Sequence, residues 1–135
     1  MKAGLAVALG LVLLAPAAAQ TPKKAAEPAA LRQEFEGFIA KFRAALKAND
    51  PAAVAGMSKL PFMGDTAIAD VAQFRTKVYA VSFGAKQRTC LQRGKAVYDR
   101  DGLNNDNYVL FCGEALYVFT KTPQGFLLTD IAAND

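Results

Sequence analysis

The sequence predicts an α+β domain in which N-terminal helices pack on one face of a curved antiparallel sheet. Over residues 31–47, apolar side chains recur every three or four positions, the pattern of an amphipathic helix. After residue 94, apolar runs are separated by turn signals at Asp101-Gly102 and at residues 123–125, which is typical of a strand meander. Helices followed by strands indicate two segregated layers.

Residues 1–19 have the pattern of a secretory signal peptide. Lys2 supplies a positive start, residues 3–14 are an apolar run too short to span a bilayer, and residues 17–19 offer a small-residue cleavage site. An uncleaved N-terminal anchor is the alternative. Residues 20–30 are rich in Ala, Pro and Lys and are expected to form a flexible leader. We therefore expect one domain over residues 31–135, periplasmic or secreted and free of the membrane after cleavage.

The first helix, over residues 31–47, is expected to turn one apolar stripe to the core: Leu31, Phe35, Phe38, Phe42 and Leu46. A second helix is expected over residues 52–57, because Asp50 can cap it and Pro51 needs no N–H at the first position. Asp70 and Gln73 have capping-box spacing and predict a third helix to about residue 80.

Two further segments before the sheet are less regular. Pro61 prevents a helix, so residues 60–64 are expected to be extended and to place Phe62 in the core. Residues 86–93 are ambiguous, and we expect a short helix with Cys90 and Leu91 turned inward.

Three strands are expected, over residues 95–99, 107–121 and 126–131. The second contains the most apolar stretch after the leader, YVLFCGEALYVF at residues 108–119. We interpret Gly113 as a β-bulge that lets this long strand bend around the first helix.

The composition excludes several kinds of site. The chain has no His, so a Ser-His-Asp triad, a Cys-His pair and a His-ligated zinc site are all excluded. A net charge of +4 is mild and gives no indication of nucleic-acid binding. The oxygen-rich loop over residues 99–106 lacks EF-hand spacing and is expected to be solvated. No cofactor and no metal are predicted.

Cys90 and Cys112 are the two cysteines of the chain. An even number of cysteines in an exported chain favours a disulfide between them, and two buried free thiols are the alternative.

Several segments together resemble the nuclear transport factor 2-like, or cystatin-like cone, superfamily. They are LRQEFEGFIAKFRAALKAND followed by PAAVAGM, then LPF before a helix, and the ending YVFTKTPQGFLLTDI. The resemblance covers residues 31–132 and implies a bent sheet wrapped against the long helix around a conical cavity. It also implies either ligand binding, dimerisation through the sheet face, or isomerase-like or cyclase-like catalysis. The His of the dehydratase members and the first-helix Tyr of the isomerases are absent here, which puts those reactions in doubt.

Four side chains are candidates for lining a ligand site. Glu114 and Asp130 interrupt apolar strands, where burial of a carboxylate would raise its pKa. Tyr79 and Tyr117 could donate hydrogen bonds into a cavity. For each of the four, an ordinary structural position is the alternative.

The sequence favours a non-catalytic domain that binds a small apolar ligand or a protein partner. A homodimer through the sheet face is one form of binding to a protein partner. The alternative function is an isomerase or cyclase that uses carboxylate and Tyr groups, with Glu114 as the first residue to test.

Overall fold

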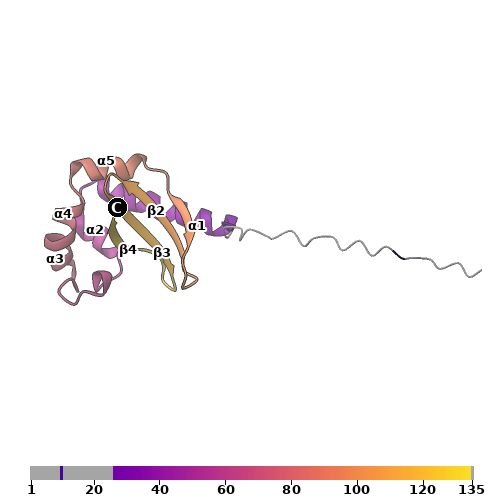
Figure 1. The fold of residues 1–135 in the computed structure, drawn as a ribbon. Helices are drawn as coiled ribbons and strands as arrows, with labels where there is room; N and C mark the ends of the chain where they lie inside the picture. The colour runs from indigo at the N-terminus through magenta and orange to yellow at the C-terminus, as the bar shows by residue number, and fades with distance from the viewer. Residues whose placement is uncertain (1–9, 11–25, 135) are drawn as a thin grey trace, which may run out of the picture.

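The computed structural model describes residue 10 and residues 26–134, so the predicted signal peptide and most of the predicted leader lie outside the described residues. Within residues 26–134, helices are followed by a four-stranded antiparallel sheet in which the strands lie side by side in their sequence order, which confirms the α+β prediction. Figure 1 shows α1 (Ala29–Lys47) running behind the strands, with α5 (Ala85–Arg93) above the sheet and the other short helices to its left. The conical cavity stays a prediction.

Helix α1 (Ala29–Lys47) begins two residues earlier than expected and packs its predicted stripe on the sheet. Phe35 stacks on Tyr108 with ring centroids 4.0 Å apart, and Phe42 meets Phe119 edge-on at 5.0 Å. All four rings are fully buried. Aromatic pairs in these geometries add to the gain from burial alone, so this layer is the centre of the core.

The predicted helix caps are present. Asp50 Oδ1 accepts a hydrogen bond from Ala53 N at 3.1 Å at the start of α2 (Pro51–Gly56). Asp70 Oδ1 accepts from Gln73 N at 2.8 Å at the start of α3 (Val71–Phe74). Helix α3 continues through a π-helical stretch, η2 (Arg75–Tyr79), into α4 (Ala80–Ser82).

The remaining helical segments answer two open questions. Residues 62–64 form a 3₁₀ turn, η1 (Phe62–Gly64), instead of the extended segment expected, but Phe62 is buried as predicted and meets Phe74 edge-on at 5.4 Å. Helix α5 (Ala85–Arg93) confirms the short helix, and Leu91 is its buried residue.

The sheet consists of β1 (Val97–Arg100), β2 (Asp106–Cys112), β3 (Ala115–Thr122) and β4 (Gly125–Ala133). The single long strand predicted over residues 107–121 is wrong, because Cys112 pairs with Ala115 across a two-residue turn. The bulge predicted at Gly113 is also wrong. Gly113 has φ 64°, which suits glycine at the first position of a type II′ hairpin turn. The register irregularity lies instead between Val118 and Phe119, opposite β4.

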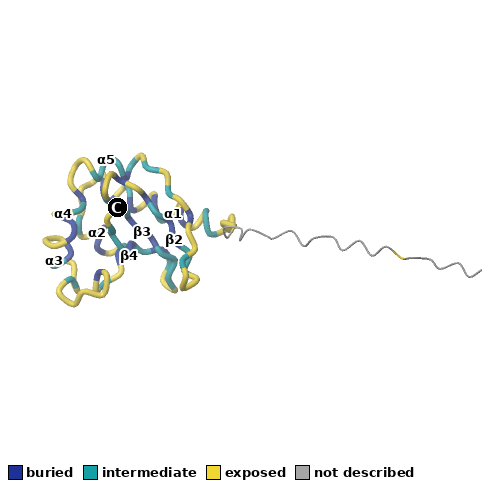
Figure 2. Tube along the Cα trace, in the orientation of Figure 1, coloured by how far each residue is buried: buried dark blue, intermediate teal, exposed yellow. Residues whose placement is uncertain are grey.

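Strand alternation gives the sheet two faces. The inward side chains are buried against the helices, and most are aromatic or leucine: Tyr98, Tyr108, Leu110, Tyr117, Phe119, Phe126 and Leu128. Figure 2 shows buried and half-buried positions alternating along the strands. The edge of β4 is partly covered, since Lys59 N donates to Leu128 O at 2.9 Å and Leu128 N donates to Met57 O at 2.8 Å.

Candidate functional site

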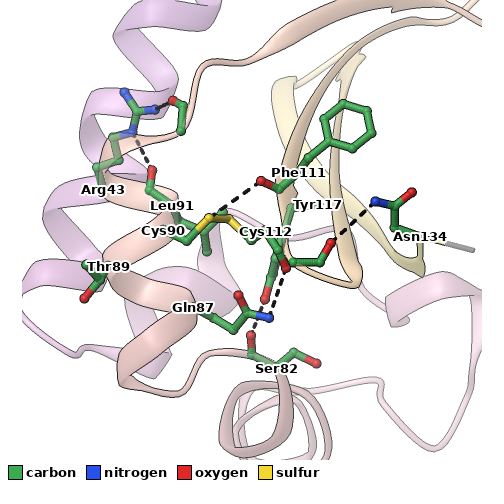
Figure 3. The surroundings of a disulfide bond; sticks show 12 residues. Arg43, Ser82, Gln87, Thr89, Cys90, Leu91, Phe111, Cys112, Tyr117 and Asn134 are labelled. Carbon is green, nitrogen blue, oxygen red and sulfur yellow. Dashed lines mark hydrogen bonds between the residues drawn. A yellow bond between two sulfur atoms is a disulfide. The ribbon is translucent and has the colours of Figure 1, made fainter.

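The predicted disulfide between Cys90 and Cys112 is present and joins α5 to the end of β2 (Figure 3). Cys112 is almost completely buried, whereas Cys90 is half-buried. Gln87 Nε2 also donates to Cys112 O at 3.3 Å. The bond therefore connects the helical layer covalently to the sheet, which indicates a structural role.

Tyr117 and Tyr79 both pack against the Phe83 ring, each with its ring centroid 5.3 Å from that of Phe83. The Tyr117 hydroxyl donates to Ser82 O (Figure 3), and burial raises its pKa to about 12. The Tyr79 hydroxyl donates to Asn49 Oδ1 at 2.7 Å, and burial raises its pKa as well. Both hydroxyls thus remain neutral near pH 7 and are already hydrogen-bonded within the fold.

Glu114 occupies the second position of the β2–β3 turn and is exposed. Its backbone oxygen accepts a hydrogen bond from Asn134 N at 2.6 Å. Together with Lys86, Gln87 and the disulfide, Glu114 lines an open groove of about 460 Å³. The carboxylate therefore lies at the tip of a hairpin and not against the Phe-rich core.

Asp130 lies in β4 directly opposite Val118. Directly opposed residues share a sheet face, so Asp130 lies on the side away from the helices. Its Oδ1 is shielded from solvent and has no hydrogen-bond partner within residues 26–134. A shielded carboxylate oxygen at the margin of an apolar surface is costly, and Asp130 is the candidate whose position is least explained by structure alone.

The four candidates are thus divided among three places. Tyr79 and Tyr117 meet around Phe83, Glu114 lies at a hairpin tip, and Asp130 lies on the far face of the sheet. The space between α1 and the sheet is occupied by stacked and edge-on rings. This arrangement does not gather the four candidates around one point.

The sheet surface that faces away from the helices is mostly apolar, with Asn107, Thr120 and Asp130 as polar members, a feature that the sequence reasoning missed. Val97, Val109 and Val118 form one cross-strand row, and Phe111, Leu116 and Ala132 form another. With Leu127, which pairs with the outward Thr120, we call these seven residues the outer face. Phe111 is 51% exposed and Val97 43% exposed, and none of the seven packs against the core. Figure 3 shows the Phe111 ring pointing away from the disulfide and α5.

A network of hydrogen-bonded polar side chains lies at one end of the outer face. Asn107 is buried and its side-chain nitrogen donates to Asp101 Oδ2 at 3.0 Å, while Thr120 Oγ1 donates to Asn107 Oδ1 at 2.7 Å. Asp101 also accepts backbone N–H groups of Leu103 and Asn105 at 2.9 Å each. The oxygen-rich loop is therefore ordered by its own hydrogen bonds. In the described part of the chain, no cluster of three or more acidic or Cys side chains could hold a metal ion.

We expect Asp101→Asn to lower the melting temperature near neutral pH. The hydrogen bonds, with the backbone N–H of Asn105 the largest contributor, lower the pKa of Asp101 from 3.8 to about 2. A lowered pKa stabilises the fold above about pH 4, and this contribution is lost as the pH falls toward 2. Thermal melts of wild type and variant should therefore converge between pH 4 and pH 2. A difference in melting temperature that is the same at both pH values would contradict this role.

No helix within residues 26–134 is long and apolar enough to cross a bilayer. No family model, curated protein or solved structure matches this chain.

Proposed function

We propose that this chain is a non-catalytic interaction domain that self-associates through the outer face of its sheet. The domain is proposed to act in the periplasm or outside the cell. The Cys90–Cys112 disulfide is compatible with such an oxidising compartment. Membership of the nuclear transport factor 2-like superfamily is part of the same proposal and rests on the sequence resemblance.

One observation carries the proposal: strands β2 and β3 are apolar on both faces. An antiparallel sheet with one solvated face normally alternates apolar and polar residues, whereas a continuous apolar run is typical of strands covered on both sides. Here the helices cover only the inward residues, and the outer face keeps Phe111, Leu116 and Val118 without a covering element in the described chain. A partner on the outer face accounts for the uninterrupted run.

The chemistry and size of the outer face favour a second copy of the chain as that partner. The seven residues are apolar, so the surface that they form is complementary to itself across a two-fold axis. Asp130 continues the row of Val97, Val109 and Val118 on the edge strand β4, and the proposed dimer has to leave its carboxylate at the rim of the interface. Four strands of about seven residues give a face on the order of 450 Å² in projection, from strand spacing and rise. This is smaller than the roughly 800 Å² per partner of a standard interface, so we expect a reversible dimer of modest affinity.

The test is a measurement of molar mass by light scattering over a concentration series. Wild type is expected to shift from monomer to dimer between about 1 and about 500 µM, the range of a modest affinity. Phe111→Ser should remain monomeric, because each copy loses an aromatic ring whose burial is worth about 2 kcal/mol.

Leu103→Ser is the matched control. Leu103 is 85% exposed but lies in the loop between β1 and β2, outside the outer face. This variant loses a comparable exposed apolar side chain and should dimerise like wild type. A wild type that is monomeric at every concentration, or a Phe111→Ser variant that dimerises normally, would exclude the outer face as the interface.

A further inference from the structure

A second surface, on the helical side of the molecule, has a different chemistry. Helix α1 and the connection from α5 to β1 enclose an open groove of about 370 Å³. Four cationic side chains line it, Arg32 and Arg43 from α1, Arg93 from the end of α5 and Lys95 from the connection, against the single carboxylate of Glu36. The sequence separates these two pairs by at least 50 residues, and only the fold brings them to one place.

Arg43 is held in a fixed position at the wall of this groove. Its Nε donates to Leu91 O at 2.9 Å and its Nη2 donates to Gly94 O at 2.6 Å. Figure 3 shows the third guanidinium nitrogen pointing away from both bonded oxygens. That nitrogen and the remaining N–H of Nη2 form the end-on edge of the guanidinium, which matches a carboxylate or phosphate group.

The opposite wall is also fixed. Gly94 lies so close to β2 that a Cβ atom there would be 2.9 Å from Leu110 Cδ2 and 3.2 Å from Cys90 O. The segment that carries Arg93 and Lys95 is therefore packed directly on the sheet. A site with fixed walls loses little conformational entropy when a ligand binds.

The charge of the groove is only partly neutralised by the protein itself. Arg32 pairs with Glu27 at 3.0 Å and with Glu36 at 3.8 Å. Within residues 26–134, the ion pairs involve Arg32 and Lys121, and none involves Arg43, Arg93 or Lys95. Three cations without a carboxylate partner around one groove favour a ligand with more than one negative charge.

We propose that the groove between α1 and the α5–β1 connection binds a small multivalent oxyanion, either a polycarboxylate or a phosphate compound. Arg43 contributes the fixed bidentate contact. Arg93 and Lys95, which are exposed, contribute mobile charges at the rim. This site lies on the helical side, so its occupation is independent of self-association through the outer face.

Isothermal titration of the purified chain with citrate, pyrophosphate and acetate tests the proposal. Citrate or pyrophosphate, or both, should bind about tenfold or more tightly than acetate, and the affinity should fall as salt is raised from about 50 to about 300 mM. Binding of citrate alone identifies a polycarboxylate site, and binding of pyrophosphate alone identifies a phosphate site. No binding of either, or equal binding of acetate, overturns the proposal.

Two double variants separate a specific groove from the overall positive charge. Arg93→Gln with Lys95→Gln should weaken binding of the preferred anion by about tenfold or more, since both charges lie at the groove. Lys41→Gln with Lys47→Gln removes the same net charge from exposed positions of α1 outside the groove and should leave the affinity unchanged. Equal losses in the two double variants would mean that the anion responds to net charge and would overturn the site.

Discussion

Removal of the disulfide, by Cys90→Ala together with Cys112→Ala, is expected to lower the free energy of unfolding by about 3 kcal/mol. The bond closes a loop with a sequence separation of 22 and so restricts the unfolded chain. Ala is the suitable replacement because Cys112 is in the core, where a Ser hydroxyl would need a new hydrogen-bond partner. Urea denaturation at low protein concentration, where the proposed self-association would not contribute, gives the difference.

Reductant provides the internal control for this prediction. It should lower the stability of wild type toward that of the double variant and leave the double variant unchanged. Reduction of the native protein should be slow, because a thiol that attacks the half-buried Cys90 sulfur must expel the Cys112 thiolate into an apolar environment. A double variant within about 1 kcal/mol of wild type would show that the disulfide adds little to the packing around it.

Phe42→Ala is expected to destabilise the domain by about 3–5 kcal/mol. Phe42 is fully buried and its ring contacts those of Phe38, Phe83 and Phe119, so truncation leaves a cavity at the junction of α1 and the sheet. This is a large part of the roughly 5–15 kcal/mol that stabilises a typical domain. Chemical denaturation followed by far-UV circular dichroism measures the loss.

Phe111→Ala is the matched control for this truncation. It removes the same atoms from a side chain that is 51% exposed, so in dilute solution the loss should be below about 1 kcal/mol. Phe42→Leu keeps most of the apolar volume, so its loss in free energy of unfolding should lie between those of Phe42→Ala and Phe111→Ala. If Phe42→Ala and Phe111→Ala lower the free energy of unfolding by the same amount, the ring layer between α1 and the sheet is not the centre of the core.

The elements that the sequence predicted well are those specified by local chemistry. The stripe from Phe35 to Leu46, the Asp50 and Asp70 caps and the turn after β3 each depend on residues within a few positions of one another. The disulfide followed from the cysteine count and the expected compartment.

The elements that the sequence did not predict depend on contacts between distant residues, or on a turn that only two residues mark in the sequence. The β2–β3 turn was hidden because the flanking strands are apolar on both faces, which leaves only Gly113 and Glu114 as a break in the pattern. The Tyr117 hydroxyl donates a hydrogen bond to Ser82 O, 35 residues away in the sequence, and no periodicity predicts such a contact. Arg43 and Arg93 meet at one groove for the same tertiary reason.

The neighbouring positions 111 and 112 have a mechanical consequence. Successive strand residues point to opposite sides of a sheet, so Phe111 contributes its ring to the outer face while the Cys112 sulfur reaches α5. A force applied to the outer face at Phe111 is therefore transmitted to α5 through the disulfide, whereas β3 and β4 contact the helices through non-covalent packing. Under shear, the end of β2 and α5 should move together, and β3 and β4 should separate from the helices first.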